Sequence, residues 1–222
     1  DAGIQNDMGV PKFAAILFDF DGVLCRDRFY KKTLLPERQD VYDWIQENIF
    51  FDKELVESWM RGETTWQQVN ERVAFATGID KNVLDEKFLE SVRSMEIDQR
   101  LIDLVGSLKQ SGTRVGLVTD NMDVFTDVTV SHHGLAEIFD VVVNSADHGF
   151  LKKERDGKLF DITLTVLGKE VKESLMVDDS PATIELFKRK GGDAFLYEDY
   201  DGLAKFLDQQ MSFPRTRESR TT

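Results

Sequence analysis

An uninterrupted apolar run, residues 14–18, ends in two acidic residues and constrains the fold of this 222-residue chain most strongly. Five consecutive apolar residues are typical of a strand that is buried on both faces of a parallel sheet. Asp19 and Asp21 follow directly, and Gly22 indicates a turn. Open α/β sheets bind ligands at the carboxyl ends of their strands, so we expect a functional site here. A strand followed by a solvated Asp-Gly turn is the alternative on these residues alone.

Later apolar segments alternate with helical patterns. The expected strands cover residues 114–120, 138–144, 175–177 and 194–196. Strands separated by helices with right-handed crossovers predict an α/β fold with a Rossmann-like, doubly wound parallel sheet. Between residues 31 and 95 no strand pattern occurs, and amphipathic segments indicate a compact α-helical insert.

The change of pattern also suggests where the parts of the chain begin and end. We expect an α/β core domain over residues 10–25 and 96–211 and a helical cap domain over residues 26–95. A chain of this length suits one full core with an inserted subdomain. The polar ends, residues 1–9 and 212–222, are expected to be flexible termini.

An excess of acidic residues narrows the range of partners. The chain has 28 Lys and Arg against 41 Asp and Glu, a formal net charge of −13, which disfavours nucleic acid because phosphate binding depends on cationic side chains. Neither a bilayer-spanning run nor the basic-then-apolar start of a signal peptide is present. We therefore expect a cytoplasmic protein without membrane contact, and we expect a monomer or weak homodimer. The single cysteine, Cys25, allows no intrachain disulfide or cysteine zinc site and is expected to be a buried filler.

Polar residues end three of the expected strands. Asp19 and Asp21 follow the first strand, Thr119 ends the second, and Asp178 and Asp179 follow the fourth. Strand ends on one edge of a parallel sheet converge in space. Clustered carboxylates repel one another, and a hard divalent ion, Mg²⁺ being the first choice, relieves this repulsion and binds phosphate oxygens. The sequence therefore predicts a metal site at this edge.

Taken in order, these motifs resemble the haloacid dehalogenase superfamily. An Asp-x-Asp-Gly-Val motif, a strand ending in Thr, a later Lys and a strand ending in Asp-Asp match that family, with the helical insert in the family's place, over about residues 12–207. The resemblance implies a Rossmann-like sheet with a mobile helical cap, in the phosphatase-like or β-phosphoglucomutase-like branch. Most members are magnesium-dependent phosphatases, which implies a small phosphorylated metabolite as the partner.

The resemblance also implies roles for individual residues. Asp19 resembles the nucleophile that becomes an aspartyl phosphate, and Asp21 resembles the general acid and base. Thr119 resembles the hydroxyl that holds phosphate. Asp179 resembles a metal ligand, with Asp178 assisting it or orienting the site. Asp19 and Asp21, the latter through its backbone carbonyl, are expected on the metal as well.

The third motif departs from the family pattern. Ser145-x-x-x-Gly149-x-x-Lys152 fits it and makes Lys152 the expected catalytic cation, but the charged loop that follows is longer than in relatives. Lys153 is therefore a second candidate for the catalytic cation. A solvated charged loop without a catalytic role is the alternative interpretation of this segment. Asp120 stands where relatives often carry Asn, and a role in the cap hinge or in binding a substrate hydroxyl is the working interpretation.

The cap is expected to determine which molecule is bound. Asp120, Asn121 and Arg61 are candidate substrate contacts, Arg61 because segment 59–63 is the best candidate to face the site. The leading hypothesis is hydrolysis of a small phosphomonoester through an aspartyl phosphate. A β-phosphoglucomutase-like sugar phosphomutase and a non-catalytic metabolite-binding protein are the alternatives. Hydrolytic dehalogenation is less favoured, because relatives of that type lack the second acid, Asp21.

Overall fold

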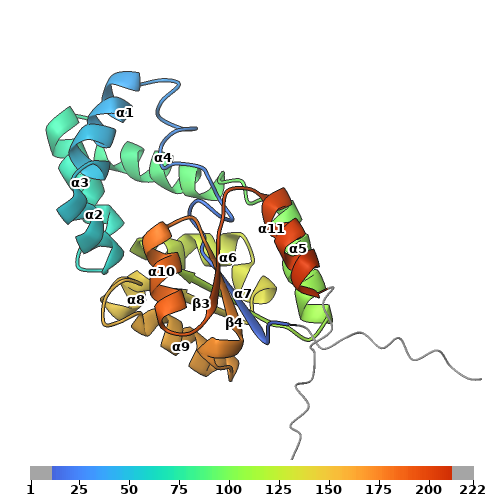
Figure 1. Ribbon diagram of the computed structural model, residues 1–222. Helices are drawn as coiled ribbons and strands as arrows, with labels where there is room; N and C mark the ends of the chain where they lie inside the picture. Colours follow the sequence, from blue (N-terminus) through green and yellow to red (C-terminus); the bar gives the residue numbers. More distant parts are fainter. Residues whose placement is uncertain (1–11, 212–222) are drawn as a thin grey trace, which may run out of the picture.

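A five-stranded parallel sheet in the order β3-β2-β1-β4-β5 forms the centre of the computed structural model, which describes residues 12–211 (Figure 1). The strands are β1 (Ala15–Phe18), β2 (Arg114–Thr119), β3 (Val141–Asn144), β4 (Ser174–Asp178) and β5 (Asp193–Leu196). Phe18 at the end of β1 pairs with Leu117 on one side and Val177 on the other. The apolar run therefore forms the central strand, and its end lies between the ends of β2 and β4.

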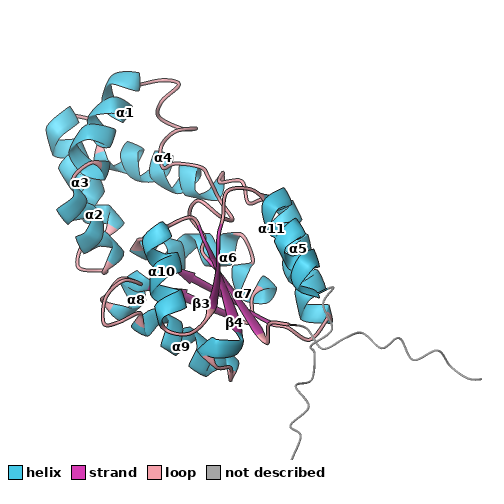
Figure 2. Ribbon diagram, in the orientation of Figure 1, coloured by secondary structure: helices cyan, strands magenta, loops and turns pink. Residues whose placement is uncertain are grey.

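Helices cover both faces of the sheet (Figure 2). The main ones are α5 (Gln99–Gln110) and α11 (Tyr200–Met211) on one face, and α9 (Lys158–Leu167) and α10 (Pro181–Arg189) on the other. Alternate side chains of a strand point to opposite faces. Ile16 and Phe18 accordingly join the first layer, and Ala15 and Leu17 the second. The predicted doubly wound α/β fold is confirmed.

Short elements connect the strands and helices of the core. They are a π-helical turn (Phe125–Thr129), α6 (Val130–His132), α7 (Leu135–Ile138), α8 (Ser145–His148) and a 3₁₀ turn (Val171–Glu173). The prediction of a strand from residue 138 was wrong at its start, because the strand begins at Val141. Leu135 and Phe139, four residues apart, are both buried in the apolar layer between the sheet and α5. That spacing suits a helical turn.

Four helices between β1 and β2 form the insert that the sequence predicted. They are α1 (Gln39–Ile45), which continues as a π-helical turn (Gln46–Phe50), α2 (Lys53–Met60), α3 (Trp66–Thr77) and α4 (Lys81–Arg93). Their buried side chains form one apolar cluster, in which Trp59 and Phe88 lie with ring centroids 6.0 Å apart. Met122 and Val124, from the segment after β2, belong to the same cluster. The core thus supplies part of the insert's interior, and a division into two domains stays a prediction.

Polar contacts hold the insert over the carboxyl edge of the sheet. Asp123, after β2, accepts hydrogen bonds from Trp59 Nε1 at 2.6 Å and from the backbone N–H of Trp66 at the start of α3. Ser145 Oγ donates to the carbonyl of Met60, the last residue of α2, at 2.6 Å. The insert therefore contacts the sheet edge at which the predicted site residues gather.

Residues 12–211 include no helix that is both long and apolar enough to cross a bilayer. The predicted flexible termini, residues 1–9 and 212–222, lie outside the described residues, as does the start of the predicted core domain at residues 10–11.

Substitution of Gly116 in β2 tests how tightly α9 packs on the sheet. A Cβ at this position would lie 2.9 Å from Leu17 Cδ2 and from Thr163 Cγ2, so Gly116→Ala should lower the free energy of unfolding by about 1–3 kcal/mol through overpacking. Gly106→Ala in α5 is the control, because its Cβ meets nothing within 4 Å and alanine stabilises a helix by about 0.5–1 kcal/mol relative to glycine. Urea denaturation measures both variants, and equal stabilities would contradict the packing described.

Candidate active site

The ends of β1, β2 and β4 bring five of the predicted site residues together. Asp19 follows β1, Thr119 ends β2, Asp178 ends β4 with Asp179 after it, and Lys152 approaches from the loop after α8. All but Asp179 are buried, with exposed fractions of 7% or less. Their meeting follows from the strand order, since β1 lies between β2 and β4.

Lys152 is the cation of this group. Its Nζ lies 2.7 Å from Asp19 Oδ2 and 2.7 Å from Asp178 Oδ2. Burial disfavours the charged ammonium, but the carboxylates of Asp19, Asp178 and Asp120 outweigh that effect and raise the pKa of Lys152 above its ordinary value. Asp120, the acid that departs from the family pattern, accepts a hydrogen bond from the backbone N–H of Lys152 at 2.7 Å. Asp120 therefore anchors the loop that carries the cation.

Lys153 and Arg61 belong to a separate group of ion pairs. Lys153 Nζ lies 2.6 Å from Glu57 Oε1, and Arg61 Nη2 lies 2.9 Å from Glu57 Oε2 and also pairs with Glu154. Of the two candidate lysines, only Lys152 contacts Asp19. Arg61 connects α2 to the loop after α8, and it does not line the cavity described below. The structure thus brings neither Lys153 nor Arg61 into contact with Asp19, Asp178 or Asp179.

Three carboxylates meet at this edge of the sheet. One oxygen each from Asp19, Asp178 and Asp179 lies within 4.8 Å of the others. Asp19 Oδ1 accepts a hydrogen bond from the N–H of Phe20, and Asp178 Oδ1 accepts one from the N–H of Ser180, both at 2.8 Å. Reduced hydration and the charge of Asp19 raise the pKa of Asp178 to about 6 and raise the pKa of Asp179. A compact set of oxygen donors of this kind fits Mg²⁺.

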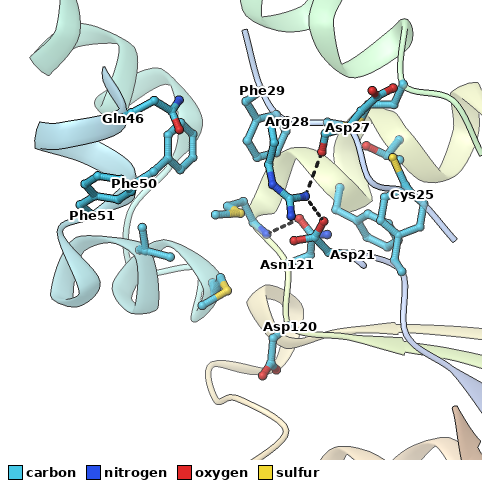
Figure 3. Close-up of a pocket in the computed structure, with 17 residues that line it drawn as sticks. Asp21, Cys25, Asp27, Arg28, Phe29, Gln46, Phe50, Phe51, Asp120 and Asn121 are labelled. Carbon is cyan, nitrogen blue, oxygen red and sulfur yellow. Dashed lines mark hydrogen bonds and ion pairs between the residues drawn. The ribbon is translucent and has the colours of Figure 1, made fainter. Parts of the chain in front are cut away.

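Asp21 lies outside this group of three and faces the insert. Its side chain is 57% exposed, and its Oδ1 lies 2.7 Å from Arg28 Nη1 (Figure 3). The enclosing walls of the cavity still reduce its hydration and raise its pKa, the charges of Asp19 and Asp179 add to this, and Arg28 opposes it. Sequence reasoning missed Arg28, because a single arginine seven residues after an acid forms no motif. A contact of the Asp21 carbonyl with a metal stays a prediction.

Thr119, the last residue of β2, and Asn121, two residues later, differ in their hydrogen bonds. Thr119 Oγ1 is buried and has no hydrogen-bond partner within residues 12–211, a costly condition that a bound ligand would remove. The Asn121 backbone N–H donates to Ser145 Oγ at 3.1 Å, and its Oδ1 accepts from the N–H of Met122. Ser145, which the sequence singled out only as part of a spacing, therefore links Asn121 to α2.

A cavity of about 320 Å³ opens beside Asp21, between the core and the insert (Figure 3). Asp120 and Asn121, two of the predicted substrate contacts, line it from the core. Cys25 also lines it, but burial raises the pKa of its thiol to about 11. This agrees with the expected role of Cys25 as a filler, because the thiol form is a poor nucleophile.

Comparison with known proteins agrees with this geometry. A protein-family model described as haloacid dehalogenase-like hydrolase matches residues 13–191. The chain belongs to this family. The resemblance drawn from the order of the motifs is confirmed, while the branch within the haloacid dehalogenase-like hydrolases stays a prediction. A search of curated proteins found no significant match.

Solved structures of other haloacid dehalogenase-like proteins share the fold. A predicted HAD-like family hydrolase from Porphyromonas gingivalis has a TM-score of 0.71 at 17% identity, covering 91% of this chain and 100% of the other. A HAD family enzyme from Bacteroides thetaiotaomicron, in complex with magnesium and inorganic phosphate, has a TM-score of 0.63 at 17% identity, covering 86% and 98%. L-2-haloacid dehalogenase from Xanthobacter autotrophicus has a TM-score of 0.62 at 17% identity, covering 88% and 82%.

Gly22 determines how closely Asp179 approaches the end of β1. Its φ is +80°, and a Cβ there would lie 2.0 Å from Asp179 Oδ2. Gly22→Ala should displace this carboxylate and weaken Mg²⁺ binding by about 10–100-fold. Gly78→Ala is the matched control, because its φ is +71° but its Cβ meets nothing within 4 Å.

Both variants should lose about 1–2 kcal/mol of stability through the left-handed backbone, and only Gly22→Ala should lose metal affinity. Calorimetric titration with Mg²⁺ and thermal unfolding measure the two effects. An unchanged Mg²⁺ affinity in Gly22→Ala would mean that the position of Asp179 does not matter for the metal.

Proposed function

We propose that the chain is a magnesium-dependent phosphatase that hydrolyses a small phosphomonoester through an aspartyl phosphate. The observation that carries this proposal is the environment of Asp19. This buried carboxylate pairs with Lys152 and lies close to two further carboxylates, and the neighbouring strand β2 ends in Thr119, whose hydroxyl has no hydrogen-bond partner within residues 12–211. A phosphate ester needs cations and hydrogen-bond donors placed around its oxygens, and this group supplies them. The Bacteroides thetaiotaomicron enzyme, which has the same fold, was solved with the two ligands that the proposal requires.

Mg²⁺ suits the donor set of this site. Asp19, Asp178 and Asp179 offer three carboxylate oxygens close together, and hard divalent cations prefer oxygen ligands. Bound there, the ion would offset the negative charge of the phosphate and of the nucleophile. Lys152 contributes a fixed positive charge beside Asp19 and Asp178, so the site does not depend on the metal alone for charge balance.

The proposed reaction has two halves, and Asp19 and Asp21 act in both. In the first half, an oxygen of Asp19 attacks phosphorus, the bond to the leaving oxygen breaks, and protonated Asp21 donates its proton to that oxygen. Thr119 Oγ1 donates a hydrogen bond to the phosphate. In the second half, Asp21 accepts a proton from water as the water oxygen attacks phosphorus, and the bond to Asp19 breaks. Inorganic phosphate and the alcohol leave, and both carboxyl groups return to their starting states.

Hydrolysis of p-nitrophenyl phosphate tests the proposed function. With Mg²⁺ the chain should release phosphate, and Asp19→Asn should lower kcat by about 10³-fold or more because it removes the nucleophile. Asp103→Asn, an exposed acid on α5, is the control and should retain activity. Activity should vanish with excess chelator and return with Mg²⁺. Activity that persists in Asp19→Asn or in chelator, or transfer of the phosphoryl group to a sugar hydroxyl in preference to water, would contradict the proposal.

Adjacent lysines provide a matched pair of variants for the cation. Lys152→Met leaves Asp19 and Asp178 buried without their ion pair, and this should cost about 3–5 kcal/mol of stability. It should also lower kcat by about 10²-fold or more, since the cation beside the nucleophile is lost. Lys153→Met removes only a surface pair and should cost less than about 1 kcal/mol. Steady-state kinetics and urea denaturation measure both, and a larger loss of activity in Lys153→Met would reverse the assignment.

A further inference from the structure

The cavity lies between Asp21, at the carboxyl edge of the sheet, and the insert. Asp21, Asp120 and Asn121 line it on the core side, and Gln46 and Phe50 line it on the insert side (Figure 3). In the proposed mechanism Asp21 contacts the leaving oxygen, so the rest of the leaving alcohol extends into this space. Its volume of about 320 Å³ is near the lower end of the range of about 300–1,000 Å³ for small-molecule sites. The space fits a single small organic group.

Most of the cavity wall is aromatic or aliphatic. Five phenylalanines line it, Phe20, Phe29, Phe50, Phe51 and Phe125, together with three methionines. Phe20 and Phe125 lie edge to face with centroids 4.9 Å apart, and Phe29 and Phe50 are stacked at 5.9 Å. Aromatic walls favour a ring by stacking and edge contacts, and methionine adapts to its shape.

The charged side chains of the wall are already bonded to the protein. Arg28 donates to Asp21 at 2.7 Å, Asp27 accepts from Lys32 at 2.7 Å, and Asp120 accepts from a backbone N–H. A sugar has a hydroxyl on almost every carbon, and each hydroxyl that leaves water needs a new partner. This wall offers few partners, so a sugar is a poor occupant.

Gln46 is the exception among the cavity side chains. Its Nε2 is buried and lacks a hydrogen-bond partner in the part of the chain described, a condition that it shares only with Thr119 Oγ1. Gln46 begins the π-helical turn of the insert, and the second π-helical turn, Phe125–Thr129, contributes to the core side of the same cavity. Such turns occur frequently at functional sites. Rotation of the Gln46 amide toward the cavity would let one hydrogen-bond acceptor on the occupant satisfy it.

We propose that the substrate is the phosphate monoester of an arylalkyl alcohol, whose ring lies among the phenylalanines and carries one hydrogen-bond acceptor for Gln46. This inference rests on the proposed phosphatase function and adds the class of the leaving group. It separates the chain from enzymes that act on sugar phosphates.

Benzyl phosphate and glucose 6-phosphate form a suitable pair of test substrates, because both release a primary alcohol and differ little in intrinsic reactivity. With Mg²⁺, kcat/KM for benzyl phosphate should exceed that for glucose 6-phosphate by about 100-fold, as expected when only one leaving group matches the wall. A ratio of one or less would overturn the inference and leave the phosphatase function standing. Release of phosphate from neither ester nor from p-nitrophenyl phosphate would overturn the proposed function instead.

Binding tests the cavity separately from catalysis. Calorimetric titration of the unmodified chain with Mg²⁺ present should give an affinity for benzylphosphonate about tenfold higher than for 2-hydroxyethylphosphonate, since neither has an ester bond to hydrolyse and only the former carries a ring. Equal affinities would overturn the inference whatever the kinetic result.

Two exposed phenylalanines of the insert provide a matched pair of variants. Phe51 is 76% exposed and lines the cavity, whereas Phe75 on α3 is 95% exposed and does not line it. Phe51→Ser should lower kcat/KM for benzyl phosphate by about 5–10-fold with a smaller effect on glucose 6-phosphate, because it removes part of the aromatic wall. Phe75→Ser should change neither value. Equal effects of the two substitutions would count against the cavity as the leaving-group site.

Gln46→Leu tests the acceptor on the ring. In the unmodified chain, one of the three methoxybenzyl phosphate isomers should react with a kcat/KM about 5–10-fold above that of benzyl phosphate, as one added hydrogen bond allows. Gln46→Leu should abolish this gain and keep the activity toward benzyl phosphate. A gain that persists in Gln46→Leu, or no gain for any isomer, would remove Gln46 from the proposal.

Discussion

The buried ion pairs of Lys152 with Asp19 and Asp178 are the interactions on which the rest of the site depends. Three charges out of water are tolerated only when each has a partner in good geometry. Asp120 and Glu154 hold the loop in place by accepting hydrogen bonds from the backbone N–H groups of Lys152 and Leu151. The extra acid at position 120, unfavourable beside a phosphate at first sight, therefore serves to hold the cation.

The same loop connects the charge centre to the insert. Glu154 accepts a hydrogen bond from the backbone N–H of Leu151 and also pairs with Arg61 at the end of α2. Ser145 and Asp123 add two further contacts between the core and the insert. The insert and the loop that carries Lys152 thus share their anchoring groups, and α2 also lines the cavity through Val56 and Met60. A change in the position of α2 would therefore act on the cavity wall and on the support of Lys152 together.

Parts of the site could be predicted because they follow from patterns along the chain. Asp19, Thr119 and Asp178 come directly at the ends of apolar runs, and the ends of neighbouring parallel strands meet in any doubly wound sheet. Arg61 was a reasonable candidate for binding an anion from its place in the insert. Its ion pairs with Glu57 and Glu154 join groups far apart in sequence, and no pattern along the chain indicates them.

The sheet, the helical insert and the gathering of the acids at one edge follow from the sequence alone, because strand and helix periods and strand ends are local properties of the chain. The folded structure was needed to choose between Lys152 and Lys153, which are adjacent in sequence but pair with the buried Asp19 and the partly exposed Glu57, respectively. It also decided the apolar character of the cavity, whose walls combine Gln46 and Phe50 with Phe20 and Phe125. Contacts of this kind depend on where distant segments pack, and the periodicity of a segment carries no information about its distant neighbours.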